Sequence, residues 1–111
     1  MAFTFSQLFA PVQLAATSAT IYTQSVAGGV LKNGRIRLVN TSASAVPVTL
    51  YAVPSGGSPT AANCCLSAKS IAANDYLDID IPTLAVNDTL RGFAGTANVI
   101  TAFEMGGVVY S

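Results

Sequence analysis

The sequence predicts an all-β fold, a single antiparallel β-sandwich of jelly-roll type that follows an extended N-terminal arm. Short runs of β-branched and apolar residues recur roughly every 8–14 residues, separated by Gly, Pro, Asn, Ser and Asp. No stretch keeps apolar residues at i, i+3, i+4 and i+7 for long enough to form a helix. A chain of 111 residues supports one core, so we expect an arm at 1–11 and one domain at 12–111.

Turn residues bound each predicted strand. Asn33-Gly34 and Asn74-Asp75 are typical of tight turns, and Pro82 ends the strand before it because it has no N–H to donate. The expected strands are 12–15, 19–25, 34–41, 46–53, 64–72, 75–82, 88–94 and 98–110, the last bent or divided at Gly106-Gly107.

Alternation along these strands predicts the core. Thr49 and Tyr51 lie on the face opposite the apolar residues of their strand. Both faces of the stretch from Val99 to Met105 are largely apolar, so this strand is either central or covered by a partner. The inward-facing residues are Ile36, Leu38, Val48, Leu50, Leu77, Ile79 and Ile81.

Two charged doublets occupy outward positions. Arg35 and Arg37 share one strand face, and Asp78 and Asp80 share another with the same spacing. Asp78 and Asp80 could hint at a calcium ion, but calcium needs six or more oxygens, which favours a solvated or arginine-paired face. Ion pairing between the doublets requires their strands to be neighbours.

Composition excludes most enzyme mechanisms. There is no histidine, the commonest general base and metal ligand, and no glycine-rich phosphate loop or G-x-S-x-G motif. We therefore expect no catalytic, cofactor-binding or metal-ligating residues and no enzyme activity. Five basic and five acidic residues balance, which leaves no basic patch for nucleic acid, and no apolar run spans a bilayer.

The two cysteines, Cys64 and Cys65, are adjacent. On a regular strand their thiols face opposite sides, and a disulfide between neighbours requires strained geometry. We expect free thiols, one buried and one at a packed or exposed surface, as suits assembly in a cytoplasm.

The arm is unusually aromatic. Phe3, Phe5, Leu8 and Phe9 precede the first expected strand, and such side chains either dock on a neighbouring subunit or capsid, or cap the domain's own core. We take these four residues as candidate subunit or capsid contacts.

The low charge indicates that much of the protein surface is buried in an assembly. Only 9% of residues are charged and 51% are hydrophobic, whereas free cytosolic domains carry more charge to stay apart. We therefore expect a structural or binding role as a homo-oligomer, with a trimer preferred to a dimer.

The stretch 35–58, RIRLVNTSASAVPVTLYAVPSGGS, resembles small β-sandwich structural proteins of tailed bacteriophage virions. Further similar segments are Ala61-Ala62-Asn63, 70–75 and 84–91, with Asn87 in place of the family's usual glycine. The resemblance spans about residues 20–105. The family that it points to includes capsid decoration, or cement, proteins.

The resemblance implies a virion protein that binds and stabilises the capsid lattice, assembled in the host cytoplasm. The implied partner is a major capsid protein, or a neighbouring tail or neck protein. The balanced charge and the short apolar runs predict that neither nucleic acid nor a membrane is a partner. The alternative is a tail, neck or baseplate component with the same sandwich. A carbohydrate-binding module is disfavoured by the absence of tryptophan and by scattered tyrosines.

Overall fold

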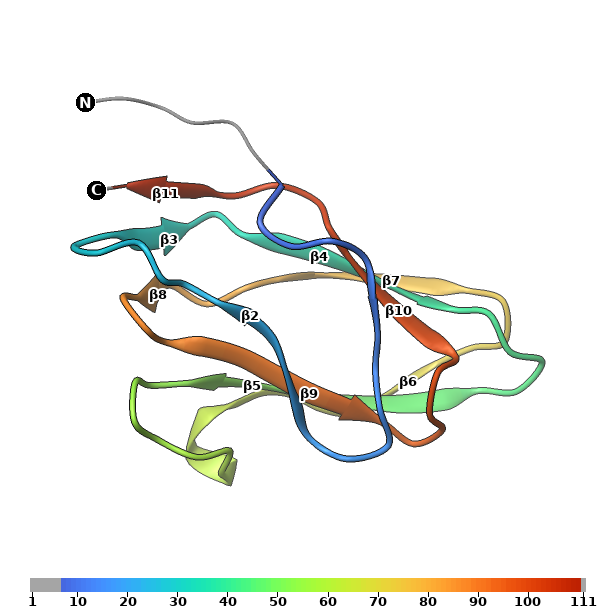
Figure 1. The fold of residues 1–111 in the computed structure, drawn as a ribbon. Helices are drawn as coiled ribbons and strands as arrows, with labels where there is room; N and C mark the ends of the chain where they lie inside the picture. Colours follow the sequence, from blue (N-terminus) through green and yellow to red (C-terminus); the bar gives the residue numbers. More distant parts are fainter. Residues whose placement is uncertain (1–6, 111) are drawn as a thin grey trace.

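The predicted all-β sandwich is confirmed by a computed structural model, which describes residues 7–110. Two four-stranded antiparallel sheets face each other, and a three-stranded sheet lies at one end (Figure 1). The first sheet has the order β1 (Val12–Gln13), β10 (Ile100–Glu104), β4 (Arg35–Asn40), β7 (Tyr76–Asp80). The second has the order β2 (Ala19–Thr23), β9 (Thr89–Ala94), β5 (Val46–Val53), β6 (Cys64–Ile71). The third has the order β11 (Val108–Tyr110), β3 (Val30–Lys32), β8 (Leu84–Ala85).

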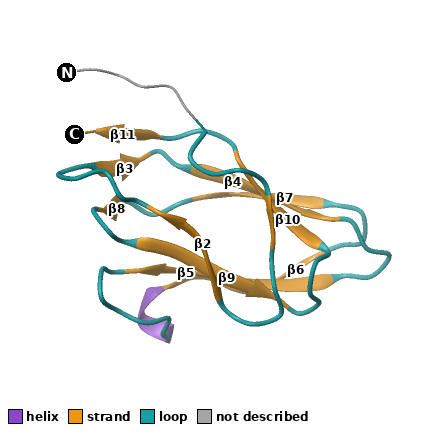
Figure 2. Ribbon diagram, viewed as in Figure 1, coloured by secondary structure: helices purple, strands orange, loops and turns teal. Residues whose placement is uncertain are grey.

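The chain alternates between the two large sheets. The pairs β1 and β2, β4 and β5, β6 and β7, and β9 and β10 each place one strand in either sheet, as in a jelly roll. Between residues 7 and 110 the helical content is one 3-10 turn, η1 (Ala61–Asn63), in the loop before β6 (Figure 2).

The core lies between the two large sheets and follows the predicted alternation. Leu77 and Ile79 of β7 are partly buried against this core. Thr49 is an exception to its expected exposure: it is only 8% exposed, and its Oγ1 accepts a hydrogen bond from the Ala68 N–H. The predicted core residues that are fully or nearly fully buried are Ile36, Leu38, Val48, Leu50 and Ile81.

The structure of the C-terminal region decides two questions that the sequence left open: whether the strand from Val99 to Met105 is central, and whether the chain divides at Gly106-Gly107. β10 lies between β1 and β4, so it is a central strand, and its inner face carries the buried Ile100 and Ala102. The chain divides at Gly106 and Gly107, whose φ values of 132° and 149° suit glycine. The short strands β3 and β8 were not predicted, because strands of two or three residues carry too little alternation to be recognised.

One buried polar side chain ties three segments together. Asn40, fully buried at the end of β4, donates from Nδ2 to the carbonyls of Ser44 (2.8 Å), Ile71 (2.9 Å) and Ala72 (3.2 Å). Its Oδ1 accepts from the N–H (2.9 Å) and Oγ (2.7 Å) of Ser42. The β4–β5 link and the β6–β7 turn are thereby held to the same side chain.

Candidate functional site

The predicted arm residues fall only partly in the described range. Phe3 and Phe5 lie outside residues 7–110. Leu8 and Phe9 are half-buried against this domain's own core, and the Phe9 ring lies 5.9 Å from the Tyr22 ring. A role for all four as contacts with another subunit stays a prediction.

The two charged doublets meet on the outer face of the β4–β7 pair. Arg37 binds Asp78 through two bonds, Nε to Oδ1 at 2.7 Å and Nη2 to Oδ2 at 3.0 Å. Arg35 Nε lies 3.2 Å from Asp80 Oδ1, and the Arg37 guanidinium lies 4.3 Å from the centre of the Tyr76 ring. This arrangement is the arginine-paired face rather than a calcium site, because both Asp78 oxygens are engaged.

The Arg37–Asp78 pair makes the stability of the fold depend on pH. The hydrogen bond from Arg37 holds the pKa of Asp78 below its ordinary 3.8. A lowered carboxyl pKa gives stability that is present above the ordinary value and is lost as pH falls through the folded-state value. We expect wild type to be more stable than Asp78→Asn at neutral pH, with a gap that closes as pH falls below about 4. Thermal melts across this range test the linkage, and a gap that stays constant contradicts it.

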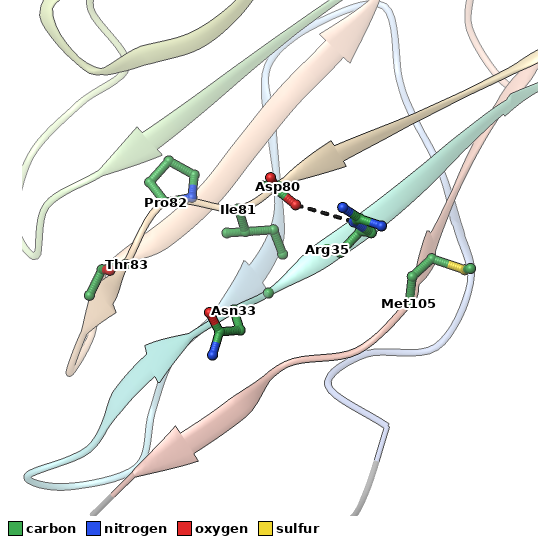
Figure 3. Close-up of a pocket in the computed structure, with 8 residues that line it drawn as sticks. Asn33, Arg35, Asp80, Ile81, Pro82, Thr83 and Met105 are labelled. Carbon is green, nitrogen blue, oxygen red and sulfur yellow. Dashed lines mark hydrogen bonds and ion pairs between the residues drawn. The ribbon is translucent and has the colours of Figure 1, made fainter.

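A wide hollow lies beside the Arg35–Asp80 pair, where the turn before β4 meets the end of β7 (Figure 3). Its volume is about 610 Å³, and it opens broadly to solvent. Its lining combines the Arg35–Asp80 ion pair with two polar side chains, Asn33 and Thr83, and with small and apolar groups. The lining residues are Asn33, Gly34, Arg35, Asp80, Ile81, Pro82, Thr83 and Met105.

Among residues 7–110, no three cysteine, aspartate or glutamate side chains gather as a metal site would require. In the same range, no helix is long and apolar enough to cross a bilayer.

β7 is an edge strand with a regular register. Its five residues pair with β4 without a shift, from Tyr76 opposite Val39 to Asp80 opposite Arg35. Backbone bonds continue the ladder at both ends, from the Asn40 N–H to the Asp75 carbonyl at 2.8 Å and from Ile81 to Gly34 at 2.7 Å.

These bonds determine which β7 groups are free. Ladder bonds in an antiparallel pair fall on every second residue, so Leu77 and Ile79 direct their N–H and C=O groups to β4. The N–H and C=O groups of Tyr76, Asp78 and Asp80 therefore point away from the sheet. The Tyr76 N–H is held by the Asp75 carboxylate at 2.8 Å, which leaves Asp78 and Asp80 as outward donors.

The other edges of the two large sheets are less regular. β1 has two residues, and β2 has one register shift, at Ile21. β6 has two shifts against β5, one at Ser67-Ala68, where Ala68 has φ 45°, and one at Cys65. Short and bulged edges discourage strand addition, so β7 is the edge best suited to receive another strand.

The bulge in β6 also determines the thiol positions. Leu50 pairs with Leu66 and the next residue, Tyr51, pairs with Cys64, so Cys65 is an extra residue without a partner on β5. Both thiols are free; Cys65 is exposed, whereas Cys64 is half-buried and its Sγ donates to the Leu66 carbonyl at 3.4 Å. As expected, the two cysteines differ in exposure: Cys64 and Leu66 are half-buried, and Cys65 between them is exposed.

Two shallow hollows flank this end of β6. One, of about 420 Å³, contains Cys64 and the Tyr51–Phe93 ring pair, whose centres are 6.4 Å apart. The other, of about 460 Å³, contains Cys64, Cys65 and one charged residue, Asp88. Neighbouring atoms desolvate the Cys65 thiol and raise its pKa, so it is mainly protonated at neutral pH.

No family model and no curated protein matches this chain. One solved structure has a similar fold: a protein from Bacillus endospore appendages, which are described as a novel family of disulfide-linked pili. The two share 23% sequence identity with a TM-score of 0.56, over 92% of this chain and 81% of that one. At this identity the comparison shows the shared β-rich fold.

This comparison corrects the predicted function. The role as a phage capsid decoration protein, or as a tail, neck or baseplate component, is contradicted, because the structural relative belongs to a bacterial pilus rather than a virion. No finding supports a major capsid protein as the partner. The physical reason is that low charge and the turn pattern of a sandwich indicate only a β-protein that assembles. Both shells and fibres are built from such subunits, so these features do not distinguish between them. The phage resemblance itself has no family match to test it.

Proposed function

We propose that this chain is a non-catalytic structural subunit that assembles with copies of itself into a pilus-type fibre. The open, regular edge of β7 is the observation that carries this proposal. The fold shared with a subunit of disulfide-linked pili supports it, as does the low charge of the chain.

Strand addition at β7 supplies the contact. The outward N–H and C=O groups of Asp78 and Asp80 offer hydrogen bonds to an incoming strand. The carboxylates do not repel this strand strongly, because Arg37 and Arg35 neutralise them. Pairing of two β7 strands would still place aspartates opposite each other, which disfavours a β7–β7 contact.

An uncharged edge of the next copy fits β7 better than a second β7 does, and β2 is the longest uncharged edge although it carries one bulge. β2, ATIYT, carries no charge, is longer than β1, and has one shift where β6 has two. β2 and β7 belong to different sheets and lie on opposite sides of the sandwich (Figure 1). Their contact is therefore head-to-tail. Such a contact repeats as an open fibre when the rotation between copies does not close, and forms a ring, such as the expected trimer, when it does. We propose the open fibre.

Proline at the outward position tests this contact. Asp78→Pro removes an N–H that points away from β4, so the β4–β7 ladder bonds remain while strand addition is blocked. We expect wild type to form fibres in electron micrographs and in sedimentation, and Asp78→Pro to stay monomeric.

Asp78→Ala is the matched control, because it loses the same ion pair but keeps the N–H. We expect Asp78→Ala to assemble, and both variants to melt within a few degrees of each other. Fibres from Asp78→Pro in the same yield as from Asp78→Ala, or a wild-type protein that stays monomeric, would overturn the proposal.

A further inference from the structure

We infer that Cys65 forms a disulfide with Cys65 of a second copy, a twofold covalent link that is separate from the β7 contact. The inference rests on the proposed function in treating the partner as a copy of this chain. It specifies which thiol reacts, which surface it joins and how far the covalent link can extend.

The position of the cysteines in the chain fixes the symmetry of the link. The sequence has two cysteines, and they are adjacent, so any disulfide between copies joins the same end of β6 in both. A contact between identical surfaces is twofold and closes at two subunits. This link therefore cannot continue a fibre by itself, and growth depends on the head-to-tail strand contact.

The geometry selects Cys65 over Cys64. Cys65 is exposed at a bulge without a β5 partner, whereas Cys64 is half-buried with its thiol directed at the Leu66 carbonyl. A bond between the two within one chain is disfavoured, because Cα atoms across a trans peptide are about 3.8 Å apart and disulfides span about 4.4–6.8 Å.

The surface around Cys65 suits close approach of two copies. The hollow beside it is lined mainly by small and apolar groups, including Ala52, Pro54 and Ala62. Its one charged residue, Asp88, is engaged by the N–H groups of Ser55 and Ala85, each at 2.9 Å. These bonds satisfy acceptor positions of the carboxylate, so each surface brings one hydrogen-bonded negative charge and no other charged side chain of this hollow to the contact.

The reaction needs a small-molecule disulfide as oxidant. The Cys65 thiolate attacks one sulfur of this disulfide, which forms a mixed disulfide and releases one small thiol. The Cys65 thiolate of the second copy then displaces the other small thiol. Two protein thiols lose two protons and two electrons, and the oxidant is reduced to two thiols.

The test is oxidation of the reduced chain with oxidised glutathione at mildly alkaline pH, followed by denaturing gels without reductant. We expect wild type and Cys64→Ser to give a covalent dimer of twice 11.3 kDa and nothing larger, and Cys65→Ser to stay monomeric. Reductant should return the dimer to monomer. The Cys64→Ser variant is the matched control, since it removes a thiol one residue away.

Repeating the oxidation in Asp78→Pro separates the two proposals. The dimer should still form there, because the link does not use β7; failure of Asp78→Pro to block fibres would overturn the proposed function and leave the dimer result intact. Dimers from Cys65→Ser but not from Cys64→Ser, a ladder of larger covalent species, or an intact-mass monomer two daltons light would overturn the inference. Glutathione adducts that never proceed to dimer would overturn it too.

Discussion

Replacing Gly92 by alanine is expected to lower the free energy of unfolding by about 3 kcal/mol and Tm by roughly 10–25 °C. Gly92 lies in β9 between β2 and β5, opposite Leu50. A Cβ there would lie 2.4 Å from Leu50 Cδ2 and 2.6 Å from the Thr49 carbonyl oxygen. The leucine can rotate, but the carbonyl belongs to a central strand and moves only with its ladder.

Thermal and denaturant unfolding measure this loss. Gly57→Ala is the control, because it makes the same change in an exposed loop where the nearest atom, the Pro54 carbonyl oxygen, is 3.1 Å away. We expect Gly57→Ala to change stability by less than about 1 kcal/mol. Equal effects at the two positions would show that close packing of β9 against β5 is not the cause.

Replacing Asn40 by alanine is expected to cost about 2–3 kcal/mol and roughly 8–24 °C in Tm. Alanine removes all five side-chain bonds that Asn40 makes to Ser42, Ser44, Ile71 and Ala72. The Ile71 carbonyl, whose bond from Asn40 is buried, then loses a donor that water cannot easily replace. The β4–β5 link and the β6–β7 turn should loosen together.

Hydrogen exchange checks the second part of this expectation, with faster exchange in both segments. Asn63→Ala is the control, because Asn63 also bonds backbone groups of Ser58 and Thr60, at 2.9 and 3.0 Å, but these bonds are exposed. We expect less than about 1 kcal/mol there, since water replaces the lost partners. A loss at Asn63 as large as that at Asn40 would argue against burial as the source of the effect.

The charged doublets show how far the sequence leads toward the site. Their spacing predicts that Arg35 and Arg37 share one face and Asp78 and Asp80 another. The two faces meet because their strands are neighbours in the sheet. This pairing joins segments about 40 residues apart, and the alternation within each strand does not predict it. The structure supplies it as the register of β4 against β7.

The thiols show the same limit. The sequence identifies adjacent cysteines on a strand, and alternation then predicts opposite faces. The bulge at Cys65 is a feature of the register of β6 against β5, where Leu50 pairs with Leu66 and Tyr51 pairs with Cys64, so the residues of β6 alone do not indicate it. That β7 is an edge strand likewise follows from the strand order of its sheet and not from the residues of β7 themselves.

By itself the sequence determined the all-β class, most strand positions, the inward faces of those strands and the absence of a histidine-based site. These follow from local chemistry: the two-residue period of a strand, turn residues with special φ values, and the side chains present. The tertiary structure alone decided the strand order, the bulges, the free edge and the five bonds of Asn40. Each of these depends on contacts between distant segments, and such contacts are set by packing the two sheets around one core.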